Sequence, residues 1–397
     1  MGTLRPRRSA GLVFIVASAF WLAVVWRLGA GRLASIPRPG KLPFTFAWWE
    51  AVPVAKHLLL GQANAGDYLA GRAYASYTPL FFLIMYALMA PWKHIAGIPY
   101  DVVHNFVVFY FIAAFGGLLL FWNRHRMPGL RGPGRFRDAG VLFALAGVVV
   151  THPPIWLGLL GFNPDNFYLF VTLVFCHLLL GGGIAHFAEW GAFVALVVPL
   201  HAPAWALIGA AQRIRGWART AAAVLALAAF SYFLPAAIVR LAGYKSLSSG
   251  FLFRSGLDGN TSYLSNLFQA FARPLVPAER MWFFSLYILA PIAVGGWVAR
   301  LDSEAGRAYF RLAFSLSIPY ACVLILFPQA VSIHPYLMDP LLTVPATALL
   351  FRGVLEPAVL ESLDGPRLAY AILAAGFMIM TNLLSLAQGF QSLLPHV

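Results

Sequence analysis

Glu50 is the residue best placed to do chemistry, within the segment TFAWWEAVPVAKHLLLG at residues 45–61. Charged residues make up only 11% of the chain, so a carboxylate between two apolar stretches is conspicuous. Pro53 suits the first turn of a helix and Gly61 suits the position after its end, which predicts a short helix over residues 52–60. Glu50 would lie just before the positive end of that helix, where an ionised carboxylate is favoured and can act as a general base.

Glu50 and a second acidic residue, Asp67, each have a catalytic and a structural interpretation. Glu50 could instead cap the helix or pair with Lys56 or Arg72. Asp67, in the sequence GDY, could be a second catalytic acid or an acceptor-binding group. It could equally be an ordinary turn-forming aspartate after a glycine.

Further polar candidates cluster before two later apolar segments. Asn163, Asp165 and Asn166 could hold a polar ligand, or could simply cap a helix. His334 and Asp339 begin a late apolar segment, and ionisable groups at membrane depth are candidates for function.

The polar stretch at residues 241–280 contains Arg254, Arg273 and Arg280 among Gly, Ser, Asn and aromatic residues. Such a loop could close over a ligand and hold a phosphate with an arginine. It could also be a solvated loop whose arginines meet lipid head groups.

The remaining reactive residue types suit packing. His152 and His177 are expected to be buried and hydrogen-bonded. Cys176 and Cys322 lie in apolar segments and suit packing better than a disulfide or a metal site. No His or Cys spacing typical of a zinc site occurs, so neither a metal nor another cofactor is expected.

The elements that must position these residues are membrane helices. Hydrophobic residues make up 60% of the 397-residue chain and its mean hydropathy is +0.76. Long apolar stretches predict a single all-α, polytopic membrane domain over residues 1–397 with about eleven spans. The net charge of +14 is explained by arginines at helix ends that face anionic lipid, so no nucleic-acid partner is expected. The predicted spans lie near residues 10–29, 78–96, 104–122, 139–158, 166–183, 188–211, 219–240, 281–299, 309–328, 335–351 and 369–388.

Arg5, Arg7 and Arg8 place the amino terminus inside by the positive-inside rule. Counting spans then puts the polar stretches 30–77 and 241–280 on the outer face, the first with a helix lying on the membrane surface. One segment disagrees, because the strongly basic residues 123–138 also fall outside in this count. Either one early span is not a true span, or this loop binds something anionic.

Four motifs in order carry a family resemblance. The first runs from LLLG (58–61) through GDY to Y-x-P-L, with Tyr77 and Pro79, and into an apolar helix that ends in AP. The others are GLLGFNPDNFYLFVTLVF (158–175), WGAFVALVVPLHAPAWALIGAAQRIRGW (190–217) and VSIHPYLMDPLLTVP (331–345). The set resembles the GT-C glycosyltransferases, and especially their bacterial polyprenyl-phosphate-mannose-dependent branch.

The resemblance implies an inverting transfer of a sugar, possibly mannose, from a polyprenyl-phosphate donor to a lipid or glycan acceptor. The site would face the outside of a bacterial inner membrane. Glu50 or Asp67 would be the base. The residues implied to bind the donor phosphate or substrate are Arg72, Tyr77, Asn163, Asp165, His201, Arg254, Arg273, His334 and Tyr336.

Two departures from the family pattern matter. The family acid aligns near Trp48 or Trp49, so that Glu50 is displaced by about a residue. His201 stands where a lysine is expected, and a phosphate contact from histidine would depend on pH. Two alternatives stay open. The displaced acid is compatible with a non-catalytic glycolipid-binding relative, and intramembrane polar residues that line a path would instead indicate a lipid-linked glycan transporter or flippase.

Overall fold

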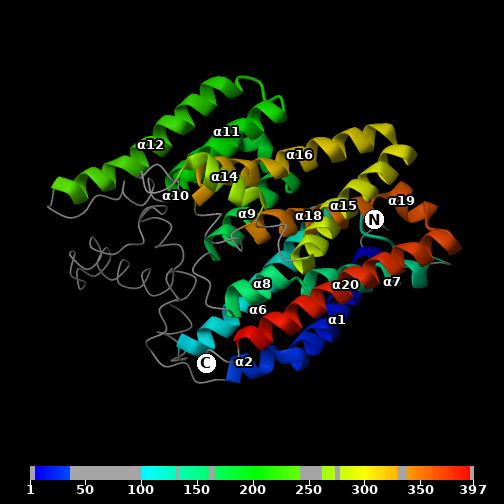
Figure 1. Ribbon diagram of the computed structural model, residues 1–397. Helices are drawn as coiled ribbons and strands as arrows, with labels where there is room; N and C mark the ends of the chain where they lie inside the picture. Colours follow the sequence, from blue (N-terminus) through cyan, green and yellow to red (C-terminus); the bar gives the residue numbers. More distant parts are fainter. Residues whose placement is uncertain are drawn as a thin grey trace.

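The computed structural model describes residues 5–35, 100–130, 134–160, 166–241, 262–272, 278–329 and 338–393, and every regular element in these ranges is a helix (Figure 1). Among the described residues, five helices are long and apolar enough to cross a membrane, or six if one bent pair counts as a span. The five are Ser9–Leu33, Arg135–Leu157, Trp217–Leu234, Ser303–Leu326 and Gly365–Gln391. The predicted all-α membrane class is therefore confirmed at this level.

The helices follow the apolar stretches of the sequence. The amino-terminal helix α1 (Arg5–Val25) continues through a π-helical turn η1 (Trp26–Ala30) into α2 (Gly31–Ser35). The other long helices are α6 (Tyr100–Asn123), α7 (Arg135–Val150), α9 (Asn166–Leu180), α12 (Trp217–Leu241), α15 (Ala278–Leu301), α16 (Ser303–Leu326), α18 (Met338–Val354) and α20 (Gly365–Leu393). The shorter ones are α8 (Pro153–Leu160), η3 (Gly183–His186), α10 (Phe187–Val197), η4 (Pro199–His201), α11 (Ala202–Ala211), α14 (Tyr263–Ala272) and α19 (Pro357–Ser362).

The predicted span at 188–211 is corrected, because this stretch is a helical hairpin. Val198 leaves the helical conformation at φ −135° and ψ 59°, and Pro199 follows it. Helix α11 then returns along α10, with Gly191 packed on Trp205 and Gly209 on Phe187. Each arm is about 15 Å long at 1.5 Å per residue, half of a hydrocarbon core of ~30 Å.

The remaining predicted spans coincide with helices, except the one near 78–96, which lies outside the described residues. The predicted surface helix at 52–60 and most of the first polar stretch also lie outside them. Within the second polar stretch the structure describes α14. Its Leu264 and Phe268 are exposed, while Asn266 is buried and donates to Gln329 at 3.5 Å.

The helices α1, α7 and α20 run in the same direction. The Trp21 Nε1 of α1 donates to the Phe143 carbonyl of α7 at 3.2 Å. Close to it, a Cβ on Gly147 of α7 would stand 2.8 Å from Trp21 of α1 and 2.5 Å from Ile379 of α20. Further along the first and last of these helices, a Cβ on Gly29 in η1 would stand 2.9 Å from the Phe390 ring of α20. Figure 1 accordingly shows the start of α1 at the same end of the bundle as α19, and the end of α20 beside α2.

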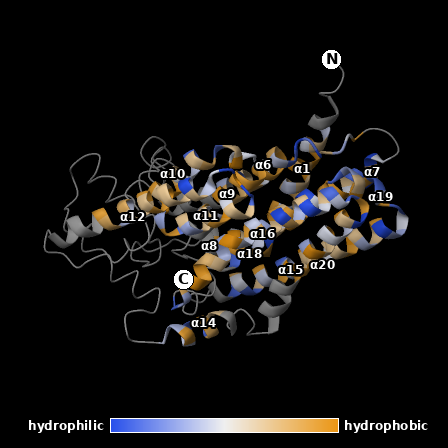
Figure 2. Ribbon diagram, turned by 90° about the horizontal axis from the view of Figure 1, so that it is seen from above, coloured by the Kyte–Doolittle hydropathy of each residue, from blue (hydrophilic) through white to orange (hydrophobic). Residues whose placement is uncertain are grey.

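Arginines gather at the end of the bundle where α1 begins, which we call the basic end. Hydrophilic colouring is evident there around α7 and α19 (Figure 2). Helix α6 ends at it, since Arg126 pairs with Glu356, just after α18, at 2.8 Å. Trp122 near the end of α6 donates to His177 near the end of α9 at 3.1 Å. The exposed or half-buried arginines of this end are Arg124, Arg126, Arg135, Arg137, Arg300, Arg307, Arg352 and Arg367.

The described part of the basic segment 123–138 thus lies at the same end as the start of α1. The span count that put it on the other side is wrong at this point. The hairpin at 188–211 lies after this segment and so affects only the later count. Because it does not cross from end to end, the later count still places the 241–280 stretch on the outer face. The positive-inside rule is then obeyed without an anionic ligand for the 123–138 loop.

At the opposite end of the bundle lie the helix ends that border the longer gaps between the described ranges. There Leu157 of α8 packs on Gly389 of α20, and Tyr263 of α14 donates to the Ile325 carbonyl of α16 at 2.7 Å. The helix ends found at this end are those of α2, α8, α12, α16 and α20, together with the beginnings of α6, α9, α15 and α18.

Candidate functional site

The candidate site begins where the span formed by α7 and α8 is interrupted. Helix α7 ends at Val150, and α8 begins at Pro153, which lacks an N–H to continue the helix. Thr151 and His152 fill the break, and both are fully buried. The Trp156 indole donates to the Val150 carbonyl at 2.6 Å, so a carbonyl freed by the break is hydrogen-bonded again.

A buried hydrogen-bonded chain, the Asn382 network, joins this break to two other helices. Tyr287 Oη of α15 donates to Asn382 Oδ1 of α20 at 2.9 Å. The Asn382 Nδ2 donates to Thr151 Oγ1 at 3.1 Å, and that hydroxyl donates to the Gly147 carbonyl at 2.7 Å. An amide, a phenol and a hydroxyl therefore satisfy one another inside an apolar bundle, where an unsatisfied polar group is costly.

His152 lies against the Asn382 network. Its ring is 5.7 Å from the Tyr287 ring and 6.1 Å from the Phe115 ring, edge-on to both, and the backbone of Thr343 on α18 lies nearby. The predicted burial is confirmed. Since the site combines an imidazole with a phenol and an amide, it can hold or pass a proton or bind a polar group at mid-bundle.

For His177 the predicted hydrogen bond is confirmed, but the predicted full burial is not. The ring is half-buried, its Nδ1 accepts the hydrogen bond from Trp122, and Trp190 packs edge-on at 6.2 Å. Both cysteines are buried free thiols, in agreement with a packing role. Within the described ranges, no three His, Cys, Asp or Glu side chains meet as metal ligands would.

The structure describes the side chains of two predicted candidates. Asp339 lies at the start of α18, and its carbonyl accepts from Thr343 Oγ1 at 2.6 Å. The other candidate is His201. It ends the short η4 helix at the tip of the α10–α11 hairpin, and only 2% of it is exposed. Its N–H donates to the Val198 carbonyl at 2.8 Å, and its ring lies 6.5 Å from Phe175 of α9. The imidazole is thus at the turn of the hairpin, enclosed by the protein.

The other predicted site residues lie outside the described residues, so whether they come together stays a prediction. They are Glu50, Asp67, Arg72, Tyr77, Asn163, Asp165, Arg254, Arg273, His334 and Tyr336. Each of these residues belongs to a segment bordered by described helices. The bordering helix termini lie on the side of the bundle opposite the basic end.

Sequence reasoning missed Tyr287, Thr151 and Asn382. One signal was available, because Asn382 interrupts the apolar run at 369–388 and Thr151 precedes a histidine and two prolines. No pattern in the sequence, however, pairs these positions with each other.

Comparison with known proteins does not identify the chain. No protein-family model, curated protein or solved structure matches it.

Proposed function

We propose that the protein is a membrane glycosyltransferase with a GT-C-like fold. It transfers a sugar from a polyprenyl-phosphate donor to a lipid or glycan acceptor. The proposal rests on the four ordered motifs and on one structural observation. Helix ends at one end of the bundle flank every segment that carries a candidate residue, from Glu50 to Tyr336. That arrangement supports a common site at this end.

The chemistry assigns one role to each kind of residue. Glu50 accepts the proton of the acceptor hydroxyl while the hydroxyl oxygen attacks the anomeric carbon. The bond between that carbon and the phosphate oxygen breaks, which inverts the configuration, and the phosphate leaves with its lipid. His334, with His201 or an arginine of the second polar stretch (Arg254 or Arg273), stabilises the charge on the departing phosphate.

The distribution of arginine supports an orientation for the site. Cytoplasmic connections of membrane proteins carry an excess of Lys and Arg. The basic end would therefore face the cytoplasm, and the candidate residues would face the outside of a bacterial inner membrane. A donor and acceptor at the outer leaflet would reach them there.

One observation favours a second candidate, a flippase for a lipid-linked glycan. The α10–α11 hairpin and the α7–α8 break are interrupted membrane helices, which transporters use to build binding sites near the bilayer centre. In that reading the Asn382 network and His201 would line a path for the glycan.

A reconstituted assay separates the two candidates. Purified protein in liposomes would receive a radiolabelled polyprenyl-phosphate sugar and a lipid extract as acceptor, and both transfer and donor translocation would be measured. The proposal expects labelled product without donor translocation. Translocation without product, across several sugars, would contradict the enzyme and support the flippase.

A further inference from the structure

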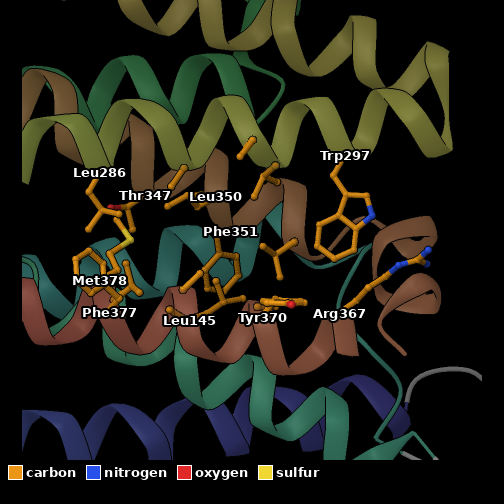
Figure 3. A pocket seen from close by; sticks show the side chains of 18 residues that line it. Leu145, Leu286, Trp297, Thr347, Leu350, Phe351, Arg367, Tyr370, Phe377 and Met378 are labelled. Atoms are coloured by element: carbon orange, nitrogen blue, oxygen red, sulfur yellow. The ribbon is translucent and has the colours of Figure 1, made fainter. Parts of the chain in front are cut away.

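A groove runs along the bundle between α15 and α20 and encloses about 500 Å³ (Figure 3). Helices α7 and α18 form its floor, where Val148, Leu350 and Phe351 are buried. On the rim, Tyr370 and Phe377 of α20 are 74% and 60% exposed, so the groove opens on the apolar outer surface of the bundle.

The two ends of the groove differ in chemistry. Thr347, Leu286 and Met378 close the inner end, and the lining between the ends is alanine, leucine, valine and phenylalanine. Arg367 and Trp297 lie at the other end, and Tyr370 lies between them and the middle of the groove, as Figure 3 shows. Trp and Tyr are enriched where lipid head groups meet the hydrocarbon core.

The length of the groove matches one leaflet. Helix α20 rises about 16 Å between Arg367 and Met378 at 1.5 Å per residue. A leaflet contributes half of a hydrocarbon core of ~30 Å. An extended chain whose head lies at Arg367 therefore reaches the middle of the bilayer at Met378.

Arg367 can bind a phosphate. Its Nε lies 3.9 Å from Asp364 Oδ1, and both side chains are more than half exposed, at 57% and 63%. An ion pair so exposed contributes little. Its Nη1 donates to the Ser362 carbonyl at 3.3 Å. The guanidinium has five N–H donors in a planar fork, so others remain for a phosphate oxygen.

We propose that this groove binds one acyl chain of an anionic phospholipid from the leaflet at the basic end, with the lipid phosphate on Arg367. The apolar lining of the groove selects the acyl chain of the lipid, and the positive charge of Arg367 at the end of the groove selects the anionic head group. The site lies at the opposite end of the bundle from the proposed donor site, and it does not depend on the proposed activity.

Native mass spectrometry on the full-length protein tests this site. Protein from nanodiscs with equal amounts of dioleoyl-phosphatidylglycerol and dioleoyl-phosphatidylcholine should retain one phosphatidylglycerol. Arg367→Gln should lower that retention about tenfold, as expected for the loss of a charge-assisted contact. Ala374→Phe should abolish it by filling the groove. The matched controls, Arg219→Gln on α12 and Ala369→Phe on the same helix, should retain the lipid.

Three results would overturn the proposal. They are equal retention of the two lipids by the wild type, unchanged retention in Arg367→Gln, and displacement of the phospholipid by added polyprenyl phosphate. Arg367 is exposed, so its substitution tests the head-group contact even if Ala374→Phe does not fold.

Discussion

Asn382 joins three helices through one side-chain amide. Its oxygen accepts from Tyr287 and its nitrogen donates to Thr151, and all three side chains are almost fully buried. In a bundle surrounded by lipid, such bonds hold helices in register because few competing partners are available. The amide therefore fixes α20 and α15 against the break in α7.

Tyr287→Phe is expected to destabilise the protein by about 0.6–1.7 kcal/mol, since it removes the only donor that Tyr287 offers to Asn382. Thermal unfolding in detergent, followed by intrinsic fluorescence, would measure the change. Tyr370→Phe is the matched control, because this tyrosine is 74% exposed. Equal melting temperatures for the two variants would argue against the Asn382 network.

At this scale the sequence predicted the environment of residues better than their partners. Burial of His152 and the cysteines followed from their apolar neighbours, because hydropathy is a local property. The bond between Asn382 and Thr151 joins positions 231 residues apart, and such a pairing depends on how the helices pack. The proposed catalytic role of Glu50 stays a prediction.

At the scale of elements, the α10–α11 hairpin is the main departure from expectation. Residues 188–211 are apolar over a length that suits one membrane crossing, and length and hydropathy cannot distinguish a crossing from two half-length arms. Pro199 marked the position of the break. The hairpin closes because Gly191 lets α10 approach α11 and α12, where Trp205 and Val224 leave no room for a side chain.

Gly191→Ala is expected to destabilise the hairpin by about 1–3 kcal/mol through overpacking. A Cβ there would stand 2.6 Å from Val224 Cγ2 and 2.8 Å from Trp205 Nε1. Gly296→Ala on α15 is the control, since its Cβ would meet nothing within 4 Å. It should be neutral or stabilising by about 0.5–1 kcal/mol. A lower melting temperature for Gly296→Ala than for Gly191→Ala would contradict this packing.

At the scale of the whole molecule, the two ends of the bundle differ in charge and in connections. The basic end has short turns, such as Asp302 between α15 and α16, whose carboxylate caps α16 by accepting from Glu304 and Ala305. The long connecting segments leave from the other end. The sequence predicted the helices from apolar length, but errors in counting crossings accumulate along the chain. Contacts between distant helices were needed to place the basic segment 123–138.

Cysteine labelling tests this arrangement. With Cys176 and Cys322 replaced by serine, single cysteines at His125, Ala185, Glu361 and Gln391 would be treated with a membrane-impermeant maleimide. The first three should react only in inverted vesicles, and Gln391→Cys only in intact spheroplasts. Reaction of His125→Cys from outside would place the 123–138 segment back on the outer face and contradict the fold described above.

The most direct test of the proposed function is the single-turnover rate of sugar transfer in Glu50→Gln. Glutamine keeps the size of the side chain but cannot accept a proton, so the rate should fall about 10²- to 10⁴-fold, the usual contribution of a general base. Glu361→Gln, at the basic end, is the matched control and should transfer at the wild-type rate. A Glu50→Gln variant that transfers sugar as fast as this control would contradict the role of Glu50 as the base.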